Sequence, residues 1–331
     1  MMKKSKYKIA FFGTPEFSVP ILKTLFESED FEVALVVTQP DRPSGRNLKL
    51  TPSPVKVWAL SNNLKVISPE SCKTDHFIEE FKSLNIEACV VVAFGQILNQ
   101  KLLNLCPDKF VNIHASLLPH LRGAAPIQRS IMMGDIETGV SLQVMVKKLD
   151  AGDVISEIKT KILPHENAIE LHDRLSILGS ELLKNDLKDF LNGKINSKPQ
   201  NEQFVTYASK IEKNETWIDW NLNAQQIWNH IRGLALGPGG TTNHNGRRLK
   251  IIRAEPLSAL DLTKLDVLLD SGTNKKPGSV VKILNEGFVV ACGEDSFLLV
   301  TSVQPESKPV MTAKAFLNNG VLKEQDQFIK S

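Results

Sequence analysis

Cysteine is scarce in this chain, and its spacing indicates neither a disulfide framework nor a zinc site. There are four cysteines among 331 residues, and none of them forms a CxxC pair or has histidines at the spacing of zinc ligands. Cys89 and Cys292 lie within apolar runs, where a free thiol behaves as a small buried hydrophobic group. We therefore expect a protein of a reducing compartment.

The chain also lacks a long hydrophobic run and a strong excess of either charge. No apolar stretch is long enough to cross a bilayer, and the N-terminal MMKKSKYKIAFFG has neither the apolar core nor the cleavage site of a signal peptide. This pattern predicts a soluble, cytoplasmic protein without a membrane partner. Charged residues make up 23% of the chain and the net charge is only +3. Any contact with nucleic acid must therefore depend on local basic patches.

Two common nucleotide-binding signatures are missing as well. The stretch FFGTPEF follows the first predicted strand, where a dinucleotide-binding fold has its glycine-rich turn, but it contains one glycine, Gly13, and a proline, Pro15. Neither a GxGxxG motif nor a Walker motif occurs in the chain. NAD, FAD and ATP are therefore poor candidates for a cofactor, and a tight turn that caps a helix is enough to explain Gly13 and Thr14.

The first part of the chain has a regular alternation of apolar and helical segments. Residues 8–12, 31–38, 87–94 and 110–115 are predicted strands, and segments of helical periodicity lie between them. An almost wholly apolar strand such as EACVVVAF is typical of the middle of a parallel sheet that is covered on both faces. We therefore expect an α/β domain with a doubly wound, mostly parallel, Rossmann-like sheet, whose ligands bind at the carboxyl ends of the strands.

The second part of the chain has a different pattern. Residues 192–205 are polar and are predicted to form a linker after a domain of residues 1–191. Residues 206–331 contain short strands that are separated by Gly, Pro and Asn turns at nearly regular spacing. This spacing predicts a small β-barrel domain of OB-like type.

Two polar side chains interrupt the apolar pattern at the end of one predicted strand. In the stretch NIHASLLP, Asn112 and His114 point to the same face, because side chains alternate along a strand. An amide donor beside an imidazole suits a reaction in which a carbonyl becomes a tetrahedral oxyanion. Asp150 and Asp153, on a later glycine-containing turn, are candidates for a carboxylate that orients the imidazole. A strand-end Asn and His that only bind loop backbone explain the spacing equally well.

Several motifs of the chain occur together, in this order and at this spacing, in one enzyme family. They are FFGTPEF, TQPDRPSGR, NIHASLLP, RGAAPIQ, GDIETGV and LDAGDVI. With these motifs the chain resembles the methionyl-tRNA formyltransferases, a group of folate-dependent formyltransferases, from its first strand to the C-terminal FLNNG. NIHASLLP followed by LDxGD is specific to folate-dependent formyltransferases and related hydrolases. The DRPSGR loop and the appended β-rich domain narrow the choice to the tRNA enzymes.

The resemblance implies an activity and a set of catalytic residues. The expected reaction moves the formyl group of 10-formyltetrahydrofolate to the free α-amino group of methionine on initiator tRNA, for translation initiation. Asn112, His114 and Asp150 match the family's catalytic residues. Asn112 and protonated His114 are expected to hold the oxyanion, while Asp150 pairs with His114 and helps to move the amine proton. No metal is required, because the leaving group is a folate nitrogen and the oxyanion already has donors.

The resemblance also implies residues for the two substrates. The folate is expected to contact the SLLP element and the end of the preceding strand, at Ser116, Leu117, Leu118, Pro119, Phe94, Gly95 and Ile97. The RNA is expected to contact a basic loop, residues 39–54, and one strand of the second domain. The candidates are Arg42, Arg46 and Lys49 in the loop, and Arg247, Arg248 and Lys250 in the strand. A solvated surface loop and the charged outer face of a barrel explain the same residues without RNA.

The chain departs from the family pattern at a few positions, and rival activities remain. His120 and Leu121 follow SLLP where the family has a basic and an aromatic residue, and Lys148 replaces a usual glycine. The segment RGLALGPGGTT, residues 232–242, replaces a motif that usually reads NPWPGAYT. The rivals are a 10-formyltetrahydrofolate hydrolase, an amino-sugar formyltransferase and a tRNA-binding protein without catalysis. A glycinamide ribonucleotide transformylase is disfavoured because it is a shorter, single-domain protein. We expect a bacterial monomer that binds no DNA.

Overall fold

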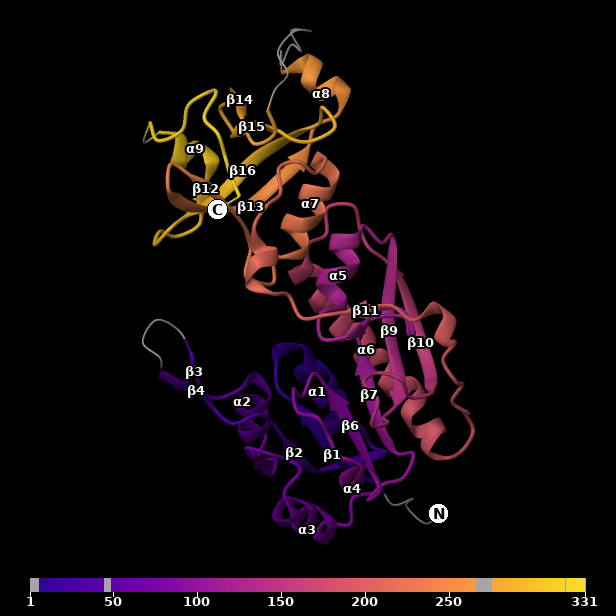
Figure 1. The fold of residues 1–331 in the computed structure, drawn as a ribbon. Helices are drawn as coiled ribbons and strands as arrows, with labels where there is room; N and C mark the ends of the chain where they lie inside the picture. Colours follow the sequence, from indigo (N-terminus) through magenta and orange to yellow (C-terminus); the bar gives the residue numbers. More distant parts are fainter. Residues whose placement is uncertain (1–5, 45–48, 266–275, 319, 331) are drawn as a thin grey trace. The chain divides into compact units, whose positions relative to one another are not determined.

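The computed structural model describes residues 6–44, 49–265, 276–318 and 320–330. The chain divides into two units, and its segments alternate between them (Figure 1). The first unit consists of Met1–Pro126, Glu137–Lys161 and His172–Ala208, and the second of Ile127–Ile136, Ile162–Leu171 and Ser209–Ser331. Residues 192–205, which the composition suggested as a linker, lie within the first unit.

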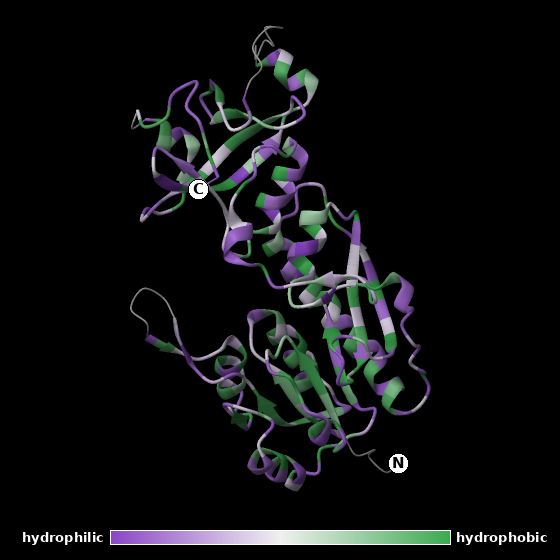
Figure 2. Ribbon diagram, viewed as in Figure 1, coloured by the Kyte–Doolittle hydropathy of each residue, from purple (hydrophilic) through white to green (hydrophobic). Residues whose placement is uncertain are grey.

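The first unit is built on a seven-stranded sheet in the order β10-β9-β7-β6-β1-β2-β5. Its strands are β1 (Tyr7–Gly13), β2 (Phe31–Val37), β5 (Val66–Ile67), β6 (Ala88–Val92), β7 (Phe110–His114), β9 (Glu137–Val144) and β10 (Val154–Lys161). The strands from β7 to β5 are parallel, whereas β9 and β10 at one edge are antiparallel to their neighbours. Figure 2 shows the inner strands in green, as expected of strands that are covered on both faces. The predicted mostly parallel sheet is confirmed.

Helices pack on both faces of this sheet. They are α1 (Val19–Glu27), α2 (Pro54–Ser61), α3 (Asp75–Ser83), α4 (Gln100–Leu103) and α6 (Ala168–Leu191). On one face, Phe81 of α3 packs against Phe12 and Phe110, with ring centroids 5.9 and 6.3 Å apart. On the other face, Gly179 of α6 lies so close to β7 that an added Cβ would be 3.0 Å from the Ile113 side chain. Strand β7 therefore directs Ile113 toward α6 and Phe110 toward α3.

Short elements complete the first unit. The strands β3 (Arg42–Ser44) and β4 (Lys49–Thr51) form an antiparallel pair, and β8 (Arg122–Gly123) pairs in parallel with β11 (Tyr207–Ala208). Helix α2 follows β4 and begins with a cap, because the Ser53 side chain accepts a hydrogen bond from the Lys56 N–H. The pairing of β8 with β11 brings the end of residues 192–208 against the loop that follows β7.

The second unit contains an antiparallel sheet in the order β12-β13-β16-β15-β14, with β17 paired to β16. Its strands are β12 (Gly240–His244), β13 (Arg247–Pro256), β14 (Val280–Ile283), β15 (Phe288–Ala291), β16 (Phe297–Pro305) and β17 (Met311–Thr312). The C-terminal segment bridges both edges of this sheet, since Ile329 pairs with Asn243 and Gln327 pairs with Ser279. The segment thus joins β12 to the residue before β14 and closes the sheet. The predicted β-rich second domain is confirmed.

Helices of the second unit come from separate segments of the chain. They are α5 (Pro126–Met133, apart from Pro126), α7 (Ala224–Gly233), α8 (Ala259–Lys264) and α9 (Ala313–Leu317). Arg129 of α5 pairs with Glu215 at 2.6 Å, and Ile227 and Ile231 of α7 are buried in the core of the sheet. None of the helices in the described ranges is long and apolar enough to cross a membrane.

Candidate active site

Strand β7 carries two polar side chains to the carboxyl end of the parallel part of the sheet. Since Ile113 faces α6, Asn112 and His114 lie on the opposite face, which is also the face of Phe110. His114 is buried and Asn112 is half-buried. The predicted alternation thus holds in the structure, and an amide and an imidazole share one face where ligands of such sheets bind.

Two contacts orient the His114 ring. Its Nε2 lies 2.9 Å from the Leu121 carbonyl oxygen. Because a carbonyl oxygen only accepts hydrogen bonds, Nε2 carries a proton and donates it. The other ring nitrogen, Nδ1, faces Oδ2 of Asp150 at 3.7 Å, which is too long for a direct hydrogen bond. Nδ1 is therefore the ring nitrogen that is left for a reaction, and a carboxylate lies beside it.

Asp150 is held in a turn by two donors. Its φ is +49°, in the left-handed region that Asp tolerates better than most residues. The backbone N–H of Gly123 donates to Oδ2 at 2.8 Å, and the side-chain amide of Gln143 donates to Oδ1 at 3.1 Å. Of the two carboxylates considered from the sequence, the structure places Asp150 beside His114, whereas the backbone carbonyl of Asp153 accepts from Val144 on β9.

A buried arginine and a glutamine support this turn, and the sequence did not single out either residue. Gln200 donates through Nε2 to the carbonyl oxygens of Asp150 and Gly152, at 2.8 and 2.7 Å. Its Oε1 accepts two hydrogen bonds from Arg122, at 3.0 and 2.8 Å. The Arg122 side chain is 0% exposed, and a buried cation is costly unless such partners surround it. Gln200 therefore links the backbone of the turn at Asp150 to the buried Arg122 side chain.

Glu202 extends the same group of side chains to the surface. Its two carboxylate oxygens pair with Arg122 at 2.8 Å and with Lys148 at 3.0 Å. Hydrogen bonds from Arg122 and then from Lys148 lower the pKa of Glu202. Lys148, a departure from the family pattern, is thus one of the cations that hold this carboxylate. The polar composition of residues 192–205 was the sequence signal, but it did not reveal partners 50 and 78 positions away.

The loop after β7 is bound to strand β9. The Ser141 hydroxyl donates to the Ser116 carbonyl at 2.7 Å and accepts from the Leu118 N–H at 3.0 Å. The Ser116 hydroxyl donates to the His120 carbonyl at 2.5 Å. Ser116 and Leu118 are both buried. Two of the four predicted folate residues of this loop therefore help to maintain its shape, Ser116 through its hydroxyl and carbonyl and Leu118 through its backbone N–H.

The other two loop residues lie nearer to open space. Leu117 packs over Gly139, where an added Cβ would lie 2.5 Å from its Cδ2. Pro119, which follows a cis peptide bond, lines a cavity of about 450 Å³ in the first unit. Residues 154–157 of β10 and residues 198–201 complete the wall of this cavity.

The end of β6 exposes less of the predicted folate surface than expected. Phe94 is only 2% exposed, and its ring packs edge-on against Phe12 at a centroid distance of 5.4 Å. The ring belongs to the core, while the Phe94 carbonyl accepts a hydrogen bond from the Gln39 side chain at 3.2 Å. Gly95, with a φ of +85°, and Ile97, which is 70% exposed, are accessible to a ligand.

The basic candidates of the first unit lie in the β3–β4 hairpin. Arg42 pairs with Glu70 at 3.0 Å, and both side chains are exposed. Lys49 is exposed at the start of β4. Arg46, the third candidate, lies outside the described residues. An exposed ion pair of this kind contributes little to stability, so Arg42 remains available to another anion.

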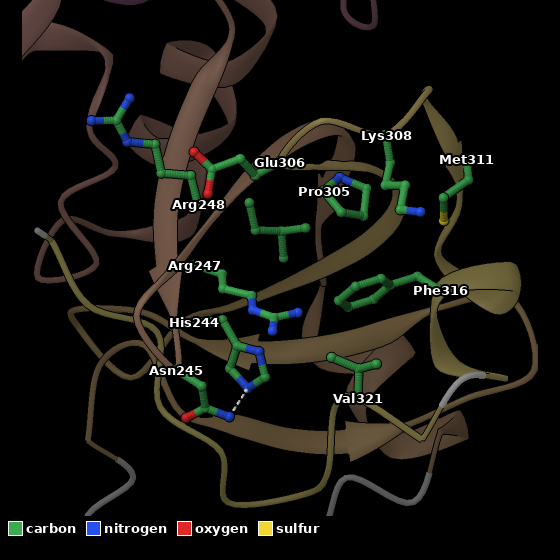
Figure 3. Close-up of a pocket in the computed structure, with 11 residues that line it drawn as sticks. His244, Asn245, Arg247, Arg248, Pro305, Glu306, Lys308, Met311, Phe316 and Val321 are labelled. Carbon is green, nitrogen blue, oxygen red and sulfur yellow. Dashed lines mark hydrogen bonds between the residues drawn. The ribbon is translucent and has the colours of Figure 1, made fainter.

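Strand β13 does not place its three basic candidates on one face. Successive strand residues point to opposite faces, so Arg248 and Lys250 share a face and Arg247 lies on the other. The guanidinium carbon of Arg248 lies 5.7 Å from the ring centroid of Trp217. Figure 3 shows the Arg247 side chain extending into a cavity toward Phe316, whereas that of Arg248 extends away from it. Arg248 and Lys250 are thus the pair at alternate positions that a basic stripe requires, and their contact with RNA stays a prediction.

The cysteine side chains are buried, and burial disfavours the thiolate form. All four are free and buried, and burial raises the pKa of Cys72 and of Cys292 to about 12. Such thiols stay protonated at neutral pH and are poor nucleophiles. Within the described ranges, no group of three or more His, Cys, Asp and Glu side chains is placed to hold a metal ion.

Comparisons with known proteins agree with this fold over nearly the whole chain. Residues 7–187 match the formyl transferase family model, and residues 210–320 match that of the formyl transferase C-terminal domain. The chain is 48% identical to a methionyl-tRNA formyltransferase of Bdellovibrio bacteriovorus, over 98% of this chain and 99% of that one. It is 40% identical to the Bacillus subtilis methionyl-tRNA formyltransferase, over 96% of each. Among solved structures, an N-formyltransferase of Helicobacter canadensis in complex with folinic acid and dTDP-3-aminofucose shares the fold. Its TM-score is 0.63 at 18% identity, over 90% of this chain and 99% of that one.

Proposed function

The chain belongs to the methionyl-tRNA formyltransferases, and from this premise we propose the reaction of its site. The enzyme transfers the formyl group of 10-formyltetrahydrofolate to the α-amino group of the methionine on initiator tRNA. The observation that carries the proposal is the group formed by Asn112, His114 and Asp150 at the carboxyl end of β7. Because translation takes place in the cytoplasm, we assign the protein to that compartment.

The reaction exchanges one carbon–nitrogen bond for another. The methionine nitrogen attacks the formyl carbon, and the carbonyl oxygen becomes an oxyanion in the tetrahedral intermediate. We assign the side-chain N–H of Asn112 and a proton on Nδ1 of His114 to this oxyanion. The bond from the carbon to N10 of the folate then breaks, the carbonyl re-forms, and N10 takes up a proton in place of the one that the amine loses. Asp150, 3.7 Å from Nδ1, balances the charge of protonated His114 and relays the amine proton through water.

We assign the folate to the edge formed by the SLLP loop and the end of β6. Ile97 and the accessible backbone at Gly95 offer a flat apolar surface for the pterin ring. Ser116 and Leu118 act by holding the loop, because both side chains are buried. We assign the catalytic role to the first unit and RNA binding to the β3–β4 hairpin and the second unit.

The two rival enzymes share the catalytic group and differ in the acceptor of the formyl group. A 10-formyltetrahydrofolate hydrolase gives it to water, and an amino-sugar formyltransferase gives it to a sugar amine. Purified protein is incubated with 10-formyltetrahydrofolate alone, with a dTDP-amino sugar, or with methionyl-tRNA, and the release of tetrahydrofolate is measured. We expect release only with methionyl-tRNA. Release into water alone, with formate as the product, establishes the hydrolase instead.

The Arg42→Ala variant is expected to use charged tRNA less well and folate equally well. Because Arg42 is exposed and, among the described residues, forms its ion pair with the exposed Glu70, its loss has little effect on the fold. Loss of one charged contact to phosphate is expected to raise the KM for methionyl-tRNA roughly 10- to 100-fold, since such a contact contributes about 1.5–3 kcal/mol. The measurement is the KM for each substrate.

Glu70→Ala is the matched control for this prediction. It removes the same ion pair but leaves the guanidinium of Arg42 free for RNA. We expect its KM for methionyl-tRNA to equal or fall below that of the wild type. If both variants raise this KM equally, the pair maintains the shape of the loop and Arg42 does not contact RNA.

The Gln200→Leu variant is expected to be both slower and less stable. It removes the amide that binds the carbonyl oxygens of Asp150 and Gly152 and leaves the buried Arg122 without its main partner. We expect unfolding to be easier by about 2 kcal/mol, as an unsatisfied buried polar group costs. We also expect kcat to fall roughly 10-fold because a displaced catalytic group reacts more slowly. Thermal unfolding and steady-state kinetics measure the two effects.

The exposed neighbour Gln203 supplies the control, since Gln203→Leu makes the same chemical change outside the network. It should keep the stability and the kcat of the wild type. If the Gln200→Leu variant is less stable but has the kcat of the wild type, Gln200 stabilises the fold and does not position the catalytic group.

A further inference from the structure

The second unit contains a cavity of about 620 Å³ that the proposed mechanism does not use (Figure 3). It lies between the start of β13, the end of β16 and helix α9, and the turn after β12 closes one end. A volume of this size is within the range of sites that bind small molecules or single groups of a larger ligand.

Two basic side chains of the cavity have no acidic partner in the described part of the chain. Arg247 and Lys308 line it, and neither forms an ion pair or a side-chain hydrogen bond within the described part of the chain. Glu306 is the carboxylate among the lining residues, whereas the guanidinium of Arg248, another lining residue, extends away from the cavity (Figure 3). Because Arg247 and Lys308 face the cavity without an ion pair to a carboxylate, they favour an anionic ligand. The planar guanidinium of arginine suits a phosphate in particular.

The opposite wall of the cavity is apolar. Met311, Phe316 and Val321 form it, and Figure 3 shows the Arg247 side chain directed toward Phe316. Val321 is 46% exposed, so this wall is open to a ligand. A small inorganic anion leaves such a wall unused, whereas a ligand with both a phosphate and a flat apolar part contacts both walls.

Hydrogen-bonding groups lie at the closed end of the cavity. His244 Nε2 lies 3.0 Å from Oδ2 of Asp326 and 3.2 Å from the side-chain nitrogen of Asn245. Asp326 therefore fixes the imidazole, and the Asn245 amide stands beside it on the turn between β12 and β13. Because Asp326 engages Nε2 of the buried imidazole, the Asn245 amide, which lines the cavity, is the group here that suits the polar edge of a nucleobase.

We propose that this cavity takes one unpaired nucleotide of the RNA substrate. The base packs on the apolar wall with its polar edge toward Asn245, and its phosphate binds Arg247 and Lys308. Arg247 and Arg248 are neighbours on β13 but lie on opposite faces of the strand. This arrangement favours a nucleotide within an RNA chain over a free nucleotide, because Arg248 then binds the phosphate of the adjacent nucleotide. Base contact with an apolar wall and phosphate contact with cations together are typical of proteins that bind single-stranded RNA. The inference rests on the proposed function, which supplies the RNA.

Arg247→Met tests the phosphate contact, because methionine keeps much of the length of the side chain without its charge. We expect the Kd and the KM for methionyl-tRNA to rise roughly 5- to 20-fold, and the slope of log Kd against log salt to fall by about one. The KM for folate and the melting temperature should not change. Lys314→Met removes one charge from the exposed face of α9 outside the cavity and should change the affinity less than 2-fold, on the scale of ordinary surface substitutions, roughly ±0.5 kcal/mol.

Val321→Trp tests the base contact, because it places a bulky ring on the apolar wall and leaves every charge in place. We expect it to weaken tRNA binding roughly 5- to 10-fold with the salt slope of the wild type, since base–aromatic and apolar contacts contribute about 1–3 kcal/mol. Leu260→Trp adds an exposed tryptophan on α8, away from the cavity, and is the control. Equal binding by the two tryptophan variants overturns the proposal.

A free nucleotide has the same base and phosphate as a nucleotide of RNA, so competition experiments are needed to distinguish these two ligands. Millimolar 5′-AMP or 5′-UMP is expected to compete weakly with tRNA for the wild type and not for Arg247→Met. Tight binding of a free nucleotide, together with unchanged tRNA binding by Arg247→Met, assigns the cavity to a metabolite and overturns the proposal. Formyl transfer by the wild type in the same preparation shows separately whether the proposed function stands.

Discussion

Replacement of His114 by glutamine is expected to remove nearly all formyl transfer and to leave the protein folded. The glutamine amide can still donate to the Leu121 carbonyl, which His114 Nε2 binds at 2.9 Å. It cannot carry the positive charge that the oxyanion needs on the side of Asp150. Loss of an oxyanion donor and of a proton-transfer group each reduces turnover by roughly 100- to 1,000-fold, so we expect kcat to fall at least 1,000-fold. The measurement is kcat with saturating methionyl-tRNA and folate.

His120→Gln is the control for this substitution. His120 lies in the loop that follows His114, and its ring nitrogen Nδ1 is 2.7 Å from the Thr206 hydroxyl. No part in the reaction is assigned to His120. We expect its kcat to remain within about 3-fold of the wild type, as for a residue outside the reacting group. A folded His114→Gln protein with ordinary turnover contradicts the catalytic assignment, whatever His120→Gln does.

Asp150→Asn is expected to have the second largest effect, with kcat reduced roughly 100- to 1,000-fold. The amide has the shape of the carboxylate but not its charge, so it no longer balances a protonated His114 at 3.7 Å. It also has one acceptor oxygen for the two donors, Gly123 and Gln143, that hold Asp150. Steady-state kinetics with both substrates measure the effect, and the KM values should change much less than kcat.

The same substitution at the alternative carboxylate, Asp153→Asn, is the comparison. Sequence spacing alone left both residues open, and the structure places Asp150 beside the imidazole. We expect Asp153→Asn to keep its kcat within about 3-fold. A larger loss at Asp153 than at Asp150 would reverse the assignment of the two carboxylates.

The parts of the fold that follow from local patterns could be predicted from the sequence. Apolar runs on β1, β2, β6 and β7 indicated inner parallel strands, and the structure has them in one sheet. The alternation along β7 placed Asn112 and His114 on one face, because successive strand residues point in opposite directions. Both inferences depend only on neighbours in the sequence, which is why they could be made without the structure.

The parts that depend on distant contacts could not be predicted. Gln200 lies in a polar segment that looked like a linker, and its role depends on Arg122 and on the backbone of Asp150, 78 and 50 residues away. Opposite charges or amides in a sequence do not reveal which of them meet. The hydrogen bonds of Gln200 with Arg122 and with the Asp150 backbone therefore depend on the folded structure and could not be inferred from the sequence.

A break in alternation explains the difference at Phe94. The residue before it, Ala93, has a φ of +46°, so the regular strand ends and side-chain directions no longer alternate. Phe94 consequently turns into the core, while Gly95 and Ile97 are exposed. At β13 alternation places Arg248 and Lys250 on one face of the strand and Arg247 on the other, and only the folded chain shows that Arg247 lies on the side of the cavity near Phe316 (Figure 3).

The most direct test of the proposed function is a formyl-transfer assay with two methionyl-tRNAs. Purified protein is supplied with 10-formyltetrahydrofolate and with either initiator or elongator tRNA that carries methionine, and formylmethionyl-tRNA is measured. We expect formylation of the initiator tRNA to be strongly preferred, and we expect His114→Gln to abolish it. Folate turnover without formylation of either tRNA would contradict the assignment, because the formyl group would then go to another acceptor.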